Sequence, residues 1–373
     1  MSKRDHTDDF FVFEPVTSAD SPKIRRELIH NIEGTILMFL QKLNTFTGDG
    51  TIGKGGKRRR SSVLVRNIVI KSRVKGSKTS FVLSHRGICR FTRQFVALCQ
   101  VYSLLIRDRK ASKRDLYYEF KKVYMDSQVY LDNAISKICR FYHKPRHCFN
   151  VTSTSRGFAQ GSLILTSEAG AEINFKPYPV AIGSELTHFN NVNMMADVIL
   201  VVEKDTVFKR LVDDGIFDVI PNVLLVTGRG FPDICTRTFL RWLMDQNPVY
   251  LFGLVDCDPY GLSIYSTYKY GAVRSEIEAN GCKLTEILLI GLFMDEVVQM
   301  NLADVHKLRI TAHDKRRLQK IQNIAKIKKD DMLYEQARQM IEAGFKVELE
   351  ALASKEPDFL LQKLILPKLR PYI

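Results

Sequence analysis

The chain has 373 residues, 45% of them hydrophobic, which is enough for two ordinary domains and excludes a disordered or fibrous protein. No apolar run approaches the roughly 18 residues of a membrane span, and nothing resembles a secretory signal, so we expect a soluble, intracellular protein with no membrane partner. The seven cysteines form no C-x-x-C pair, so we expect reduced thiols and no zinc ribbon. The net charge of +15 favours a polyanion such as nucleic acid as the partner, because neutralised phosphates release condensed counterions.

The first part of the chain, residues 1–84, predicts a helix followed by a basic arm. Apolar residues at helical spacing predict a helix over Ser21–Leu43, standing outside the main domains as a surface for a partner. From Thr51 to Arg107 there are 14 Lys and Arg and no Asp or Glu. The Gly-rich run Gly48–Lys78 predicts a linker or mobile arm. For Lys54–Lys78, contact with nucleic acid and a solvated, unstructured segment are equal interpretations. Nuclear import receptors bind basic runs such as Lys57–Arg60, so we expect nuclear localisation.

Residues 85–190 predict a mostly helical DNA-binding domain. Helices are expected over Phe91–Arg107 and Gln128–Tyr142, with a shorter helix between them that starts at a capping box of Ser112 and Asp115. An alternating strand follows at Ser162–Thr166. Three helices and then a small hairpin are the order of a winged-helix domain, mostly α with a small β wing.

Residues 191–373 predict an α/β domain built on a parallel sheet. Continuous apolar strands alternate with helical patterns, which indicates a sheet covered on both faces. The expected strands are Val198–Val202, Val223–Val226 and Val249–Val255, and the expected helices are Asp205–Val212, Pro232–Met244 and Pro259–Tyr270. Ligands of such sheets bind beyond the carboxyl ends of the strands.

Three carboxylates follow two of these strands. Glu203 ends the first strand and Asp256 and Asp258 end the third, so all three can converge at one edge, with Cys257 turned away. Clustered carboxylates repel one another unless a cation neutralises them, and hard oxygen ligands suit Mg²⁺. The sequence therefore predicts a Mg²⁺ site. For Asp258 alone, a helix N-cap ahead of Pro259 is the simpler interpretation.

Four strings in the second half resemble one family. They are Val201–Asp205 (VVEKD), Thr227–Asp233 (TGRGFPD), Val255–Gly261 (VDCDPYG) and Tyr268–Gly271 (YKYG). In this order they resemble the Toprim domain in the A subunit of type VI topoisomerases and in their eukaryotic relatives, the meiotic double-strand-break enzymes. Primases, repair proteins and nucleases also carry Toprim domains, so the first half of the chain decides the chemistry.

The sequence Arg114–Tyr118 (RDLYY) resembles the R-D-x-Y-Y motif of that family, whose second tyrosine is the nucleophile. The resemblance therefore implies that Tyr118 is catalytic. In a helix, Arg114 and Tyr118 share a face at i and i+4, whereas Tyr117 lies about 100° around the axis. Arg114 would then hold the scissile phosphate, and Tyr117 would be buried like most aromatic side chains.

The resemblance implies a transesterification that leaves a 5′-phosphotyrosyl link, with Mg²⁺ at Glu203, Asp256 and Asp258 stabilising the leaving 3′ oxygen. A free phenol has a pKa of about 10, so roughly one in a thousand is ionised at neutral pH and a cation or base must assist. Arg114 and the metal are the candidates for that assistance. A general acid and base role is the alternative for Glu203.

Further DNA contacts are expected beside the reacting groups. Arg156 precedes glycine at a position where the family commonly has Lys, and we expect it to contact a phosphate. We expect the same of Lys113, which lies beside the R-D-x-Y-Y motif. Arg237 also fits the family pattern, although an ordinary arginine on a helix surface explains it equally well.

Together these features predict an enzyme that initiates homologous recombination in meiosis by breaking duplex DNA. The resemblance implies a homodimer, since each tyrosine works in the metal site of its neighbour. It also implies an ATP-binding type VI topoisomerase B-like subunit, bound through Ser21–Leu43, and other recombination accessory proteins. The alternatives are a type VI topoisomerase A subunit that acts in DNA topology, a Toprim-type hydrolytic nuclease or primase, and a non-catalytic winged-helix binding protein.

Overall fold

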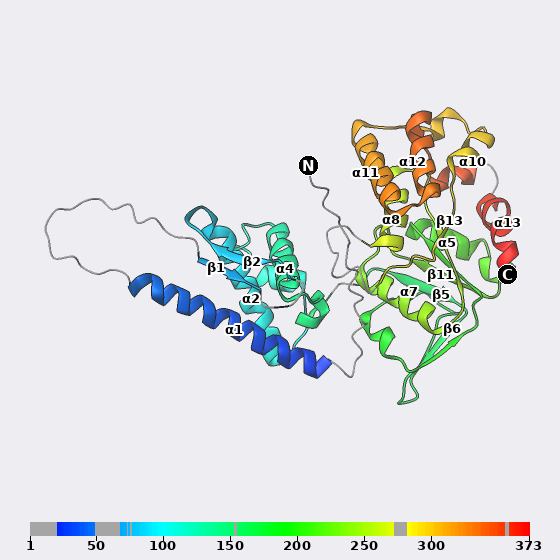
Figure 1. Cartoon of the computed structure of the whole chain (residues 1–373). Helices are drawn as coiled ribbons and strands as arrows, with labels where there is room; N and C mark the ends of the chain where they lie inside the picture. The colour runs from blue at the N-terminus through cyan, green and yellow to red at the C-terminus, as the bar shows by residue number, and fades with distance from the viewer. Residues whose placement is uncertain are drawn as a thin grey trace, which may run out of the picture. The chain divides into compact units, whose positions relative to one another are not determined.

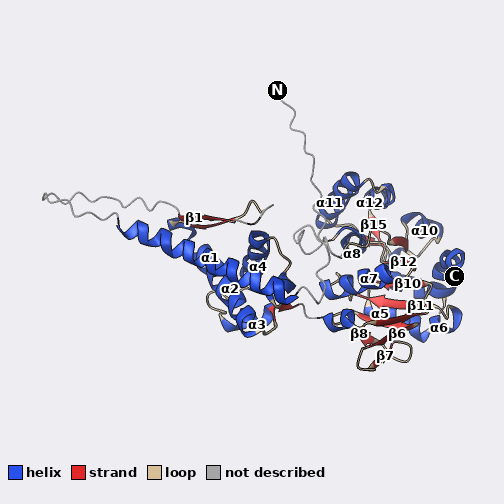
Figure 2. Ribbon diagram, turned by 60° about the horizontal axis from the view of Figure 1, so that its bottom comes forward, coloured by secondary structure: helices blue, strands red, loops and turns tan. Residues whose placement is uncertain are grey.

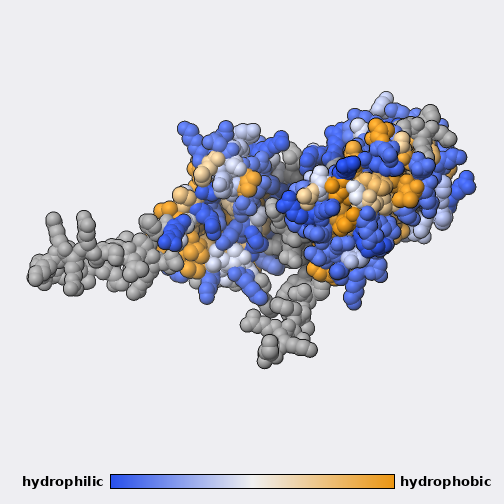
Figure 3. Space-filling view, turned by 90° about the horizontal axis from the view of Figure 1, so that it is seen from above, coloured by the Kyte–Doolittle hydropathy of each residue, from blue (hydrophilic) through white to orange (hydrophobic). Residues whose placement is uncertain are grey.

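The computed structural model describes residues 21–48, 68–72, 74, 77–152, 155–271, 282–354 and 358–373. The chain divides into two compact units, Met1–Ser153 and Thr154–Ile373 (Figure 1). Among the residues just given, no helix is long and apolar enough to cross a membrane. The surface seen in Figure 3 is mostly hydrophilic, with apolar side chains in separate patches.

The first helix, α1 (Ser21–Gly48), confirms the helix predicted there but not its place outside the domains. Its inner face carries Leu28 and Ile32, which are fully buried in the same apolar core as the later helices of the first unit. Residues at i and i+4 share one face, so this stripe is buried against a neighbour. The outer face keeps Leu37 and Leu40 exposed.

The predicted linker contains the first strand of an antiparallel hairpin, and the second strand follows directly after it. Strands β1 (Ile68–Lys71) and β2 (Ser80–Leu83) pair with each other, and their apolar residues Ile68, Ile70 and Phe81 reach the core of the first unit. The basic run Lys57–Arg60 lies outside the described residues.

Three helices follow in the predicted order. They are α2 (Ile88–Arg107), α3 (Lys113–Glu119) and α4 (Gln128–Tyr142), and the short strands β3 (Ala111–Ser112) and β4 (Val151–Thr152) pair in parallel. The capping box of α3 is confirmed. The Ser112 amide donates to the Asp115 carboxylate at 2.8 Å, and the Ser112 hydroxyl accepts from the Asp115 amide at 3.2 Å.

The second unit is built on a mixed, mostly parallel sheet with the strand order β13-β12-β10-β11-β5-β8 among the described residues. The strands are β5 (Phe158–Gly161), β8 (Val180–Ala181), β10 (Val198–Val202), β11 (Val223–Thr227), β12 (Tyr250–Leu254) and β13 (Leu288–Gly291). The first four strands in this order are parallel, and β5 and β8 pair antiparallel. Every residue of β10 and β11 is buried, which explains their continuous apolar sequences.

Helices surround this sheet (Figure 2). They are α5 (Asp205–Asp213), α6 (Ile216–Val219), α7 (Ile234–Gln246), α8 (Pro259–Tyr270) and α10 (Met294–Gln299), which lie between strands or after the last one. The helices α11 (Ala312–Lys328) and α12 (Asp331–Ala343) pack on each other and on α8. The chain then passes through β15 (Phe345–Lys346), which pairs with β14 (Leu308–Arg309), a short helix Leu349–Ser354, a π-helix Phe359–Ile365 and α13 (Leu366–Leu369).

The strand predicted as a wing belongs to the second unit instead. It is present as β6 (Leu163–Thr166), but it pairs with β7 (Glu172–Asn174) and β9 (Asn191–Met194) in a three-stranded sheet. The preceding strand β5 pairs with β11. The boundary that we expected at residue 190 therefore falls between the units at 153 and 154. Alternation of apolar residues predicts a strand but not its partner.

Candidate active site

Helix α3 is anchored to α2 by one buried amide. The Gln100 side chain donates to the Leu116 carbonyl at 2.8 Å and to the Glu119 carboxylate at 2.7 Å. Its own oxygen accepts from the Tyr124 hydroxyl at 2.7 Å. Because Leu116 and Tyr117 are also buried, the orientation of this short helix is fixed by packing and by hydrogen bonds.

The two adjacent tyrosines have opposite environments. Tyr117 is 8% exposed and Tyr118 is 69% exposed, with ring centroids 5.2 Å apart. Arg114, one turn earlier, is exposed as well. The helix thus presents Arg114 and Tyr118 to solvent on one face, as the spacing predicts. Lys113 is held differently, because its ammonium forms a 2.7 Å ion pair with Asp132 on α4.

The carboxylates of Glu203 and Asp256 lie together at the carboxyl ends of β10 and β12. These strands are neighbours, with Val202 opposite Leu254, and the Asp256 amide donates to Glu203 Oε2 at 3.0 Å. Glu203 is 7% exposed and Asp256 is 2% exposed. Burial, followed by repulsion from Asp256, raises the pKa of Glu203, and burial raises the pKa of Asp256.

Asp258 is the N-cap of α8. Its Oδ1 accepts from the Gly261 amide at 2.5 Å, and Pro259 follows as the first helical residue, so the capping interpretation is confirmed. Burial raises the pKa of Asp258, and its charge adds to the repulsion on Glu203. Cys257, between the two aspartates, is buried.

Sequence reasoning missed Lys204, although it directly follows Glu203. Its ammonium lies 2.8 Å from Asp256 Oδ2, 2.8 Å from Glu350 and 3.2 Å from Glu348. These two glutamates come from the C-terminal part of the chain, nearly 150 residues away, so no local pattern could have predicted them. Their alternation around Leu349 is the only sequence feature that they share.

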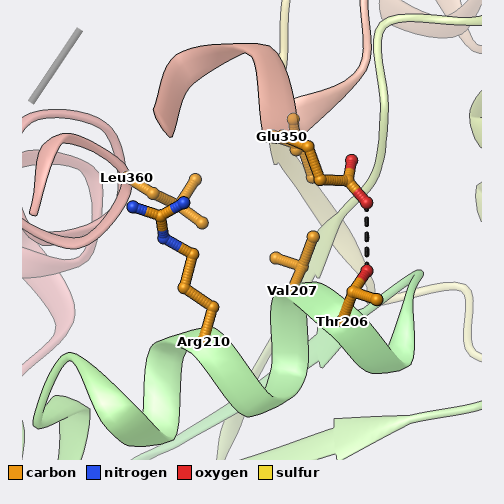
Figure 4. Close-up of a pocket in the computed structure, with 6 residues that line it drawn as sticks. Thr206, Val207, Arg210, Glu350 and Leu360 are labelled. Atoms are coloured by element: carbon orange, nitrogen blue, oxygen red, sulfur yellow. Dashed lines mark hydrogen bonds between the residues drawn. The ribbon is translucent and has the colours of Figure 1, made fainter. Parts of the chain in front are cut away.

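The segment that carries Glu348 and Glu350 is pinned beside the strand ends. The Val347 amide donates to the Cys257 carbonyl at 3.0 Å, and the Leu349 amide donates to Asp256 Oδ1 at 2.9 Å. Figure 4 shows Glu350 above α5, where it accepts from the Thr206 hydroxyl at 3.0 Å. The adjoining cavity of about 20 Å³ has room for roughly one water molecule, which excludes a small-molecule ligand there.

The donor set of this edge fits a divalent cation. Buried carboxylates with raised pKa values are stabilised by a positive charge, and their oxygens are the ligands that Mg²⁺ prefers. In the present side-chain positions of the described residues, no three such groups surround one point as metal ligands. Both oxygens of Asp256 are engaged, one by Lys204 and one by Leu349.

Gly261 allows α8 to approach the carboxylates, and Gly261→Ala should therefore destabilise the protein by roughly 1–3 kcal/mol. A Cβ at this position would lie 2.4 Å from the Asp256 carbonyl oxygen and 3.1 Å from Glu203 Oε2. Gly34→Ala in α1 is the matched control, because nothing lies within 4 Å of its Cβ, and it should stabilise by about 0.5–1 kcal/mol. Urea unfolding measures both changes. Equal changes in the two variants would contradict the crowding described here.

The raised carboxyl pKa values predict an unusual dependence of stability on pH. Because the folded state binds these protons more tightly than the unfolded state, the metal-free protein should lose stability as pH rises from the ordinary carboxyl range towards the raised values. Between about pH 5 and pH 8, Glu203→Gln should remove roughly 1–3 kcal/mol of this loss. Urea unfolding in the presence of a chelator measures it, with the exposed Glu172→Gln as control. If Glu203→Gln loses as much stability between these pH values as the wild type, the raised pKa of Glu203 is not the cause.

The structure places Arg156 and Arg237, two of the residues expected to contact DNA, in opposite environments. Arg156 has an exposed side chain, while its backbone amide is held by Asp233 Oδ2 at 2.7 Å. Arg237 is only 3% exposed, and its Nε and Nη1 have no hydrogen-bond partner within the described residues. Arg237 is therefore not a surface residue, because α7 buries this side chain, and its contact with DNA stays a prediction.

Comparison with known proteins finds a matching family model for each half of the chain. The family model for the Toprim domain of Spo11 and the topoisomerase 6 A subunit matches residues 198–369, and the model "Type IIB DNA topoisomerase" matches residues 89–151. The meiotic recombination protein spo-11 of Caenorhabditis elegans is 33% identical over 79% of this chain and 70% of its own length.

Two further relatives also match most of this chain. The meiotic recombination protein SPO11 of Mus musculus is 29% identical over 77% of this chain and 73% of its own. The meiotic recombination protein rec12 of Schizosaccharomyces pombe is 26% identical over 90% of this chain and 93% of its own length. With an N-terminal type IIB topoisomerase domain and a C-terminal Toprim domain, the chain belongs to the family of Spo11 and the topoisomerase VI A subunit.

Proposed function

We propose that this chain breaks duplex DNA in meiosis by transesterification, with Tyr118 as the nucleophile, and so initiates homologous recombination. The observation that carries the proposal is the contrast within α3, which buries Tyr117 and exposes Tyr118 beside Arg114. Relatives named as meiotic recombination proteins favour break formation over the role of a type VI topoisomerase A subunit in DNA topology.

The reaction exchanges one phosphodiester for another. The Tyr118 oxygen attacks the scissile phosphorus, the bond from phosphorus to the 3′ oxygen breaks, and the phenolic proton is passed on to that leaving oxygen. The products are a 5′-phosphotyrosyl link and a free 3′ hydroxyl, so the cleavage itself consumes no ATP. Arg114, on the same face of α3, holds the phosphate by charge and by its planar set of donors.

We assign a Mg²⁺ site to Glu203, Asp256 and Asp258. When bound, the cation supplies positive charge for the leaving 3′ oxygen and neutralises the buried carboxylates. The burial and mutual repulsion of these groups support the assignment. A general acid and base role for Glu203 is the second assignment compatible with its raised pKa, since a carboxyl with such a pKa exchanges protons near neutrality.

We further propose that two copies act together, the tyrosine of one copy working at the carboxylates of the other. Tyr118 belongs to the first unit and the carboxylates to the second, which is the division that such sharing requires. The helices α2 to α4 are assigned to the winged-helix type by their order. Arg156 and Lys113 contact DNA phosphates, the latter by exchanging its Asp132 partner.

Partner proteins are assigned to the outer face of α1. Leu37 and Leu40 are both exposed there, and residues at i and i+3 form one apolar patch. We propose that an ATP-binding B-like subunit covers this patch and that other recombination accessory proteins join the complex. The enzyme acts on chromosomes in the nucleus.

One experiment separates the proposal from its rivals. Labelled duplex is incubated with the protein, Mg²⁺ and a candidate B-like partner, and the mixture is then denatured and digested with nuclease. The proposal predicts label that stays on the protein. A Toprim-type hydrolytic nuclease would cut the duplex and leave the protein unlabelled, and a non-catalytic binding protein would leave the duplex intact.

A further inference from the structure

The carboxylate of Asp256 is already neutralised by the chain itself. It is almost fully buried, its Oδ1 accepts from the Leu349 amide at 2.9 Å, and its Oδ2 lies 2.8 Å from the Lys204 ammonium. A buried carboxylate without a counter-charge is costly, and this ion pair supplies the charge.

Lys204 faces three carboxylates rather than one. Besides Asp256, it contacts Glu350 at 2.8 Å and Glu348 at 3.2 Å. Asp256 is buried, whereas Glu348 and Glu350 are about half exposed, so the ammonium lies between an interior acid and two acids at the surface. The side chain of Lys204 is itself 28% exposed, so it is not sealed in the interior.

One of the two surface acids has a side-chain partner besides Lys204, and the backbone beside both is held in place. Glu350 accepts a hydrogen bond from Thr206 on α5, and the backbone beside both glutamates is fixed to Cys257 through Val347. Lysine carries a compact charge on a flexible four-carbon stem, so its head group can change partners by rotation of side-chain bonds alone. The ammonium already contacts both glutamates, so they can hold it when it leaves Asp256.

We infer that Lys204 is an internal counter-ion that competes with the divalent cation for Asp256, and that Glu348 and Glu350 receive its ammonium when that cation binds. The inference rests on the proposed function, in which Glu203, Asp256 and Asp258 hold the cation. Lys204 is thus a positioning residue that sets metal affinity, because an ammonium and a divalent cation repel each other at one carboxylate.

The inference fixes the signs of two substitutions. Lys204→Met removes the competitor and should tighten Mg²⁺ binding by about tenfold. Glu350→Gln removes a receiving carboxylate and should weaken Mg²⁺ binding several-fold. In the double variant the effect of Glu350→Gln should nearly vanish, because there is no ammonium left to receive. A direct effect of the Glu350 charge on the metal would instead persist in the double variant.

Isothermal titration calorimetry of the full chain with MgCl₂, without DNA, measures these affinities, and thermal unfolding in chelator checks that each variant folds. Lys209→Met is the matched control, since Lys209 lies on α5, which begins directly after Lys204, pairs with Asp205 at 2.9 Å and is exposed. Tighter binding by Lys204→Met alone, with the Glu350 effect lost in the double variant, supports the inference.

Two results would overturn the inference in distinguishable ways. If Lys204→Met binds Mg²⁺ no more tightly than the wild type, while Glu203→Gln binds more weakly, then the metal site stands and the competing role of Lys204 is wrong. If wild type and Glu203→Gln give the same Mg²⁺ titration, then the assignment of the metal to this edge fails and the role of Lys204 fails with it.

Discussion

Tyr118→Phe should abolish covalent attachment to DNA, lowering it by on the order of a thousandfold or more, because the variant lacks the attacking oxygen. The ring remains, and Tyr118 is 69% exposed, so the loss of its hydroxyl leaves no buried polar group without a partner. Duplex affinity should stay within about twofold, since phosphate contacts by Lys and Arg dominate it.

The neighbouring residue offers a control for this result. Tyr117→Phe makes the same chemical change one position earlier, on a ring that is buried. It should keep the covalent attachment. Recovery of labelled protein after denaturation measures both variants. Adducts that survive in Tyr118→Phe, or that disappear equally in Tyr117→Phe, would refute the choice of nucleophile.

Asp256→Asn should lower cleavage by more than about a hundredfold and raise the Mg²⁺ concentration needed for the remainder. Asparagine has nearly the same shape, so the change removes one negative charge from the edge shared with Glu203. The change relieves repulsion with Glu203 but also removes the 2.8 Å ion pair with Lys204, so the two electrostatic effects on stability oppose each other.

Cleavage assays over a series of Mg²⁺ concentrations measure this prediction. Asp245→Asn serves as the control, because Asp245 is an exposed acid paired with Arg241 on α7. Its Mg²⁺ dependence should equal that of the wild type. If Asp256→Asn also keeps the wild-type dependence, Asp256 has no part in holding the metal.

The parts of the fold that sequence predicts well are those fixed by local patterns. The strand Val198–Val202 and the helices Gln128–Tyr142 and Pro259–Tyr270 have the predicted bounds, since apolar runs, periodicity and capping residues are local signals. The meeting of Glu203 and Asp256 also follows, because parallel neighbours end at one edge.

The parts that sequence did not predict depend on contacts between distant segments. Alternation at Ser162–Thr166 indicates a strand, but its partners β7 and β9 place it in the second unit. The ion pair of Lys204 with Glu350 joins residues 146 positions apart. Arg237 shows the same limit, because an arginine in a helix predicts exposure and only packing shows that it is buried.

Mixed dimers test most directly whether a tyrosine acts at the carboxylates of another copy. One copy carries Tyr118→Phe and the other carries Asp256→Asn, and the two are purified together through different tags. If the tyrosine acts at the carboxylates of the other copy, the intact Tyr118 of the Asp256→Asn copy meets the intact Asp256 of the Tyr118→Phe copy at one of the two centres. We therefore expect protein covalently attached to one DNA strand. No attachment in this mixed dimer, with attachment in a dimer of one wild-type and one doubly substituted copy, would contradict the account.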